Sequence, residues 1–260
     1  MFKATWMWQY KDILNDIDGY VRFLKNNSVT DLYLQFTRQT KYRELYKPLI
    51  KELTNNGITA HATSGAPEWA IDGVHVTSFI NAVHEYNASA TPEESFCRIH
   101  LDIEPHNFQD WSTNQDSYIT AWESVVNLYT SLTKIPISAS VPFWLVKNHP
   151  SFYDFMLSKH EHLSIMAYRD VYEGSNGFSG VFEPNVLAGN NLKLPNKVVG
   201  GVELGDTSEG SNLTFYDDGI EAMNKMLDRI RYDYSNNPTF KGIAIHHLSV
   251  WRMLDEQVNN

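Results

Sequence analysis

Short apolar runs alternate along this chain with longer segments whose apolar residues recur at helical spacing. In Tyr10–Asn26, for example, Ile13, Ile17, Val21 and Leu24 fall on one helical face. The sequence predicts strands at Lys3–Trp8, Thr30–Phe36, Gly57–Thr63, Cys97–Glu104, Ile135–Val141, Leu163–Tyr168, Lys197–Glu203 and Phe240–His246. It predicts helices at Tyr10–Asn26, Tyr42–Asn55, Val76–Tyr86, Ser117–Thr133, Ser151–Lys159 and Tyr216–Tyr234, with a short helix at the chain end. The stretch Val171–Leu194 reads as a loop, with one short helix near Pro184–Leu187.

The alternation of strands and helices indicates the fold class. Eight strand–helix units in 260 residues are typical of an α/β protein with one (β/α)8 (TIM) barrel. No linker rich in Pro, Gly or Ser divides the chain, so we expect a single domain over residues 1–260. An open doubly wound sheet is the alternative architecture, but the first strand lacks the glycine-rich phosphate loop of that fold.

The run Arg98-Ile-His-Leu-Asp-Ile-Glu-Pro-His106 carries the most specific chemical signal. Successive side chains of a strand point to opposite faces, so His100, Asp102 and Glu104 share one face. Carboxylates are costly in a buried parallel strand unless they line a wet or reactive cavity. Pro105 cannot donate to the sheet and places Glu104 at the carboxyl end of the strand, where barrels keep their active sites.

Composition narrows the choice of partners. The net charge of −10 makes nucleic acid an unexpected partner. The single cysteine, Cys97, excludes an internal disulfide and a cysteine-rich metal site. No apolar run is long enough to span a membrane. The first strand is predicted to start almost at Met1, which leaves no visible signal peptide, although a removed leader would be compatible with secretion or a cell-surface origin.

The side chains expected at the strand ends suit a carbohydrate. Sugar faces stack on aromatic rings, and a pair of carboxyl groups flanks the glycosidic bond that is cut. We expect an oligosaccharide or polysaccharide substrate, catalytic roles for Asp102, Glu104 and Glu203, and no cofactor or bound metal. The expected substrate-binding residues are Trp6, Trp8, Gln35, His61, His106, Trp144, Asp170, His246 and Trp251.

Two carboxylate arrangements are compatible with these residues. Glu104 and Glu203 can face each other as acid/base and nucleophile of a retaining glycosidase, at a separation of ~5–5.5 Å. Alternatively, Glu104 is the general acid and Asp102 orients a substrate acetamide group that attacks the anomeric carbon. Two other classes stay open. One is a metal-dependent sugar isomerase using Glu104, His106, Glu203 and His246, and the other is a non-catalytic carbohydrate-binding barrel.

Several of these segments resemble the family 18 glycoside hydrolases, which include chitinases and endo-β-N-acetylglucosaminidases. Strand four of that family carries D-x-x-D-x-D-x-E. Asp102 and Glu104 match its last two acids, while Cys97 and His100 replace the earlier aspartates. Further similar segments are Ile137–Pro142, Met166–Asp170, Lys197–Gly205 and Gly242–His246. In these, Glu203 replaces a proline and His246 replaces a tryptophan.

The resemblance implies a β-linked, N-acetylhexosamine-containing glycan as substrate and hydrolysis with retention of configuration. Carried over position by position, it implies Glu104 as acid/base, Asp102 as the residue that positions the acetamide, and Tyr168 as a hydrogen-bond donor to the same group. Glu203 and His246 depart from the family pattern, and we expect them to contact the same sugar or stabilise developing charge.

Overall fold

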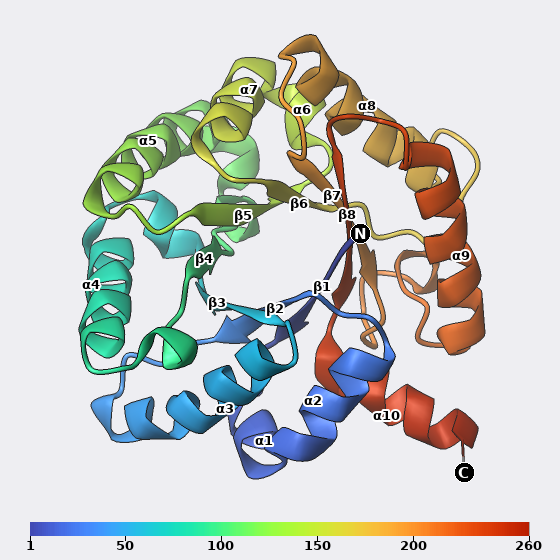
Figure 1. The fold of residues 1–260 in the computed structure, drawn as a ribbon. Helices are drawn as coiled ribbons and strands as arrows, with labels where there is room; N and C mark the ends of the chain where they lie inside the picture. The colour runs from blue at the N-terminus through green and yellow to red at the C-terminus, as the bar shows by residue number, and fades with distance from the viewer. Residues whose placement is uncertain (260) are drawn as a thin grey trace.

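A closed barrel of eight parallel strands forms the centre of the molecule. In the computed structural model, which describes residues 1–259, each strand pairs with the next along the chain and β8 pairs with β1 (Figure 1). The strands are β1 (Phe2–Met7), β2 (Asp31–Gln35), β3 (Thr59–Ser64), β4 (Arg98–Leu101), β5 (Ile137–Pro142), β6 (Leu163–Met166), β7 (Val198–Glu203) and β8 (Phe240–His246). The predicted (β/α)8 barrel is therefore confirmed.

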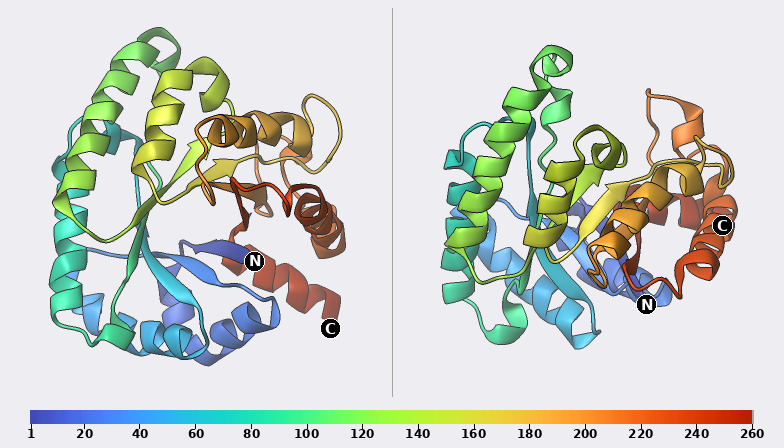
Figure 2. Two further views of the ribbon diagram at one scale, coloured as in Figure 1. Left: turned by 45° about the horizontal axis from the view of Figure 1, so that its top comes forward. Right: turned by 90° about the horizontal axis from the view of Figure 1, so that it is seen from above.

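Helices surround the strands on the outside of the barrel (Figure 1), and α4 and α5 stand side by side along one wall (Figure 2). They are α1 (Tyr10–Asn15), α2 (Ile17–Asn26), α3 (Arg43–Asn55), α4 (Val74–Ala88), α5 (Trp111–Leu132), α6 (Leu145–Asn148), α7 (Pro150–Lys159), α8 (Phe178–Asn191), α9 (Gly219–Tyr234) and α10 (Leu248–Asn259). Short 3-10 turns lie at η1 (Thr40–Tyr42), η2 (Pro67–Ala70), η3 (Pro92–Glu94), η4 (Pro105–Asn107) and η5 (Ser211–Leu213). Within residues 1–259, no helix has the length and apolar character needed to cross a bilayer.

The segment 171–194 differs most from the prediction, because it contains the 14-residue helix α8 rather than a loop. Glycines and the internal Pro184 lower its helix propensity. Phe178, Val181 and Phe182 nevertheless fall on one face and are buried. Gly200 of β7 leaves room for this face, since a Cβ there would lie 2.8 Å from Cζ of Phe178. Tertiary packing therefore overrides local propensity.

Other differences concern element boundaries. The predicted helix Tyr10–Asn26 is two helices, divided at Asp16, whose carboxylate accepts a hydrogen bond from the backbone N–H of Gly19 at 3.1 Å. The helix predicted from Ser117 begins six residues earlier, at Trp111. The strand predicted to reach Glu104 ends at Leu101. The last difference bears directly on the candidate site.

The barrel interior is unusually polar. The alternation in β4 is confirmed, because Ile99 and Leu101 join the apolar core between strands and helices while His100 is fully buried inside the barrel. His61 and His162 come from β3 and the residue before β6 and are also fully buried. Tyr33 packs among them, with its ring stacked on His100 at 3.7 Å and its hydroxyl 2.8 Å from Nε2 of His162. Barrel interiors usually hold branched apolar residues.

Candidate functional site

The carboxyl end of β4 presents Asp102 and Glu104 just beyond the last paired residue. The ladder continues for one bond, from the backbone N–H of Asp102 to the carbonyl of Ser64 at 3.1 Å. The backbone segments that follow β3 and β4 pack closely at Gly65, where an added Cβ would lie 1.8 Å from the carbonyl oxygen of Asp102. Pro105 then opens the turn η4. Glycine at position 65 is therefore required to bring Asp102 and Glu104 into the barrel mouth.

Asp102, Glu104 and Tyr168 form one electrostatic unit. Burial raises the pKa of Asp102 to about 7, and the nearby charge of Glu104 adds to this rise, while the Ser140 hydroxyl opposes it. Burial also raises the pKa of Tyr168 well above its usual value, and the charges of Glu203, Asp102 and Glu104 add to that rise. The Tyr168 hydroxyl therefore stays protonated as a hydrogen-bond donor, and the pKa of the neighbouring Asp102 carboxyl lies near neutrality.

Glu203 lies on β7 and is fully engaged in hydrogen bonds. Its Oε2 lies 2.7 Å from Nδ1 of His246, and its Oε1 accepts the backbone N–H groups of Leu204 at 2.8 Å and Gly205 at 2.5 Å. Nε2 of His246 lies 2.8 Å from the indole nitrogen of Trp8. The His246 ring faces Tyr168, with centroids 6.0 Å apart and planes 29° apart. The structure thus brings together four of the predicted site residues, Trp8, Glu203, His246 and Tyr168.

The carboxylate of Glu104 also contacts His106, which packs against Trp144. Nε2 of His106 lies 3.2 Å from Oε2 of Glu104, and the two side chains are 19% and 26% exposed. Trp144, which follows β5, packs edge-on against His106 with ring centroids 5.5 Å apart. The structure therefore places the predicted residues His106 and Trp144 beside the predicted acid.

Three predicted sugar contacts lie away from the barrel mouth. Trp6 is 1% exposed inside the barrel, where its indole nitrogen lies 3.3 Å from Nε2 of His100. His61 is fully buried against Asp31, at 2.8 Å. Trp251 is fully buried on α10 and packs against Phe23. Protein atoms cover all three side chains, so the expectation that Trp6, His61 and Trp251 contact a sugar does not fit this structure.

Gln35 and Asp170 lie at the rim without joining the carboxylate group. Gln35 is half-buried at the end of β2, and its backbone carbonyl accepts the hydroxyl of Tyr46 at 2.9 Å. Asp170 lies in the loop after β6, and its backbone N–H donates to the carbonyl of Asn212 at 3.2 Å. Within residues 1–259, no hydrogen bond or ion pair joins either residue to Asp102 or Glu104.

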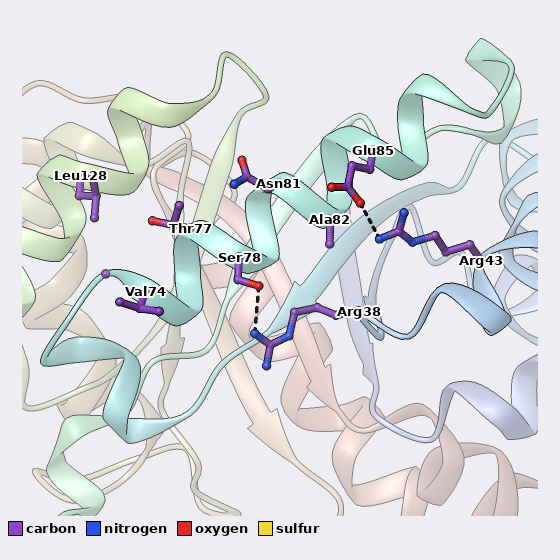
Figure 3. A pocket seen from close by; sticks show the side chains of 10 residues that line it. Arg38, Arg43, Val74, Thr77, Ser78, Asn81, Ala82, Glu85 and Leu128 are labelled. Atoms are coloured by element: carbon purple, nitrogen blue, oxygen red, sulfur yellow. Dashed lines mark hydrogen bonds and ion pairs between the residues drawn. The ribbon is translucent and has the colours of Figure 1, made fainter.

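A separate hollow lies on the outer wall of the barrel, between α3 and α4 (Figure 3). Its volume is about 680 Å³. Arg38 donates to the hydroxyl of Ser78 at 3.3 Å, and Arg43 pairs with Glu85 at 2.9 Å, as the dashed lines in Figure 3 show. Glu85 is the only carboxylate among the lining residues and is already paired. The hollow therefore lacks the paired acids that glycoside chemistry requires.

The metal-isomerase alternative finds no support in the geometry. Among the side chains of the described residues, no group of three or more His, Cys, Asp or Glu could hold a metal ion. His246 uses both ring nitrogens in contacts with Trp8 and Glu203. Glu104 and His106 instead contact each other.

Two residues near the carboxylates were absent from the predicted site. The hydroxyl of Ser140, on β5, forms a hydrogen bond that lowers the pKa of Asp102, and it also lies 3.0 Å from Nε2 of His100. Trp111 begins α5, and its ring lies 6.1 Å from that of Trp144. The late start predicted for this helix left Trp111 in a connecting loop. Its position in the sequence, seven residues after Glu104 and three after Phe108, is the signal that could have found it.

Comparisons with known proteins bear on the fold. Neither a family model nor a curated protein matches the sequence. Among solved structures, a variant of a GH18 chitinase from Cycas revoluta in complex with (GlcNAc)4 aligns over 100% of both chains, with a TM-score of 0.61 and 11% identity. The PgaB (BpsB) glycoside hydrolase domain from Bordetella bronchiseptica aligns over 100% of this chain and 97% of its own, with a TM-score of 0.60 and 10% identity.

A third similar structure is the spore cortex-lytic enzyme SleL from Bacillus cereus. It aligns over 98% of this chain and 74% of its own, with a TM-score of 0.58 and 10% identity. At this level of identity the likenesses show a shared architecture. The chain therefore shares its (β/α)8 barrel fold with these three structures.

Proposed function

We propose that this protein hydrolyses a β-linked glycan containing N-acetylhexosamine, with retention of configuration. The observation that carries the proposal is the placement of Asp102 beside Glu104 at the end of β4, next to the protonated hydroxyl of Tyr168. A half-buried acid pair with an adjacent neutral donor suits a mechanism in which the substrate acetamide is the nucleophile.

In this mechanism Glu104 gives its proton to the glycosidic oxygen as the bond to the anomeric carbon breaks. The acetamide oxygen of the same sugar attacks that carbon and forms an oxazolinium ion. Asp102 accepts a hydrogen bond from the acetamide N–H, and Tyr168 donates to the acetamide oxygen. Ionised Glu104 then takes a proton from the water that attacks the anomeric carbon, which restores the acid and yields the retained product.

The contacts of Glu203 argue against the alternative in which this residue is the nucleophile. Both of its oxygens are held, Oε1 by two backbone N–H groups and Oε2 by His246. A nucleophilic carboxylate needs one oxygen free to reach the anomeric carbon. Glu203 is therefore better suited to orient His246 and, through the stacked rings, Tyr168.

The test is Glu104→Gln, assayed on N-acetylglucosamine hexamers in each β linkage, with product release followed by mass spectrometry and anomeric configuration by NMR. We expect wild-type turnover with retention and a loss of at least about 10³-fold in the variant, with hexamer binding intact. Glu123→Gln is the control, because Glu123 is exposed on α5. Turnover by Glu104→Gln contradicts the assignment of the acid. Binding without turnover by either form identifies a non-catalytic carbohydrate-binding barrel.

A further inference from the structure

A cluster of half-buried aromatic side chains lies beyond Glu104, on elements that follow β4 and β5. His106 comes from η4, Trp111 from the start of α5, and Trp144 from the turn before α6. The ring of Trp111 lies 6.4 Å from His106 and 6.1 Å from Trp144. Half-buried tryptophans in such a cluster offer rigid apolar area to a sugar ring.

Further contacts fix this cluster in place. The ring of Tyr118, which also lies on α5, stacks on that of Trp111 with centroids 6.0 Å apart and an angle of 14° between the planes. Phe108 stacks on Tyr118 at 4.8 Å, and the Tyr118 hydroxyl donates to Asp110 at 2.8 Å. Trp111 therefore has a supported ring that needs little ordering when a ligand binds, which favours affinity.

His106 connects this cluster to the general acid. Its Nε2 lies 3.2 Å from Oε2 of Glu104, and the side-chain amide of Asn107 lies 3.4 Å from the same oxygen. Within residues 1–259, no hydrogen bond engages Oε1 of Glu104. One oxygen of the acid is thus held by η4, and the other is free to face the glycosidic bond.

The positions of the two groups around Glu104 fix the direction of the substrate. Asp102 and Tyr168 hold the acetamide of the sugar that is attacked, so that sugar lies on their side of the acid. The leaving-group sugars must then continue past Glu104, toward the aromatic cluster. We propose that Trp111 and Trp144 form the binding surface for leaving-group sugars, and that His106 positions Glu104 against this surface. This inference rests on the proposed function.

The test compares one probe whose cleavage needs leaving-group sugars with one whose hydrolysis does not. The first is the N-acetylglucosamine hexamer that the wild type cleaves. The second is the oxazoline of the N-acetylglucosamine disaccharide, which enters after the leaving group has departed. Trp111→Ala and Trp144→Ala should each lower kcat/KM on the hexamer about 10-fold or more and leave oxazoline hydrolysis within about twofold. Tyr232→Ala is the control, because this aromatic residue is 82% exposed on α9.

The role of His106 needs a readout that a purely structural role would not change. His106→Ala should lower kcat on the hexamer about 10-fold with little change in KM and alter the pH profile of kcat. His106→Gln keeps an N–H donor toward Glu104 and should restore part of kcat. His75→Ala is the control, since His75 also stacks on a tryptophan, Trp69, with ring centroids 6.4 Å apart, but comes from α4.

Several results overturn the inference. Equal losses on hexamer and oxazoline in the tryptophan variants, or no loss on either, exclude a leaving-group surface. Unchanged kcat and pH profile in His106→Ala exclude the positioning role. These failures are distinct from failure of the proposed function, which would show as full activity of Glu104→Gln. A wild type that neither binds nor cleaves any of the hexamers overturns both.

Discussion

Nδ1 of His246 lies 2.7 Å from Oε2 of Glu203, and this contact determines where the imidazole proton resides. The other ring nitrogen, Nε2, lies 2.8 Å from the indole nitrogen of Trp8. An indole N–H can only donate, so Nε2 accepts and carries no proton. Nδ1 therefore carries the proton and donates it to Glu203, which leaves a neutral histidine and an ionised carboxylate.

Removal of the Trp8 donor should release this tautomer. In Trp8→Phe, Nε2 of His246 loses its donor, and we expect the second tautomer or the doubly protonated ring to become populated. Nitrogen-15 NMR of the histidine side chains measures this directly. Trp122→Phe is the matched control, because the buried indole nitrogen of Trp122 has no hydrogen-bond partner within residues 1–259. An unprotonated Nδ1 in the wild type would contradict the assignment.

Glu203→Gln should disturb the site without abolishing the chemistry. The new amide oxygen can still accept from Leu204 and Gly205, but its NH2 group would face the N–H of His246. Two donors then oppose each other, and the His246 ring that stacks on Tyr168 must shift. We expect kcat to fall about 10-fold. If Glu203 were the nucleophile, the loss of kcat in Glu203→Gln would instead reach about 10⁴-fold or more. The wild type would then form a covalent glycosyl-enzyme that mass spectrometry could detect.

Asp102→Asn should change stability in a pH-dependent direction. The pKa of Asp102 is raised by burial and by Glu104 from 3.8 to about 7, so ionisation in the folded state is unfavourable. A raised pKa contributes stability that is complete below the unfolded value and is lost as the pH rises through the folded value. Asparagine cannot ionise and avoids this loss. We expect the Tm of Asp102→Asn to exceed that of the wild type by about 2–4 °C per kcal/mol gained at pH 9, but not at pH 4.

Thermal unfolding at both pH values provides the measurement. Asp116→Asn, on the exposed face of α5, is a control for the loss of one negative charge. A stability difference between wild type and Asp102→Asn that is equal at pH 4 and pH 9 would mean that Asp102 is ionised as readily in the folded chain as in the unfolded one.

The alternation of polar and apolar residues was enough to predict the barrel and the carboxylates at the end of β4. Alternation tells which face of a strand a side chain occupies, but it does not tell depth along the barrel. His61 and His246 both point inward, yet one is fully buried and the other lies at the mouth. For the same reason Trp6 on β1 and Trp8, just beyond its end, differ in their access to solvent.

Long-range contacts account for the other misses. The helix α8 forms because Phe178 and Phe182 pack against Gly200 of β7, a contact that no local propensity contains. Glu203 looked like a candidate nucleophile because the sequence does not show that Leu204, Gly205 and His246 occupy its oxygens.

Four fully buried histidines, three of them in the barrel interior and His160 at the end of α7, should make the protein sensitive to mild acid. Burial lowers the pKa of His100 and His162 well below 6.5, lowers that of His61, and lowers that of His160 to about 4. A lowered histidine pKa contributes stability that is present above the unfolded value of 6.5 and is lost as the pH falls toward the folded value. Between pH 6.5 and 5, each such histidine should therefore reduce the free energy of unfolding by up to about 1.4 kcal/mol per pH unit.

His162→Gln isolates one of these contributions. Glutamine can keep a hydrogen bond to the hydroxyl of Tyr33, which lies 2.8 Å from Nε2 of His162, but it does not titrate. Urea unfolding of this variant should show a smaller dependence on pH between 6.5 and 5 than the wild type, whatever the change in absolute stability. His84→Gln, an exposed histidine on α4, should leave that dependence unchanged. Equal pH dependence in the wild type and His162→Gln would show that protonation of His162 does not oppose folding, because its proton would then be held equally in both states.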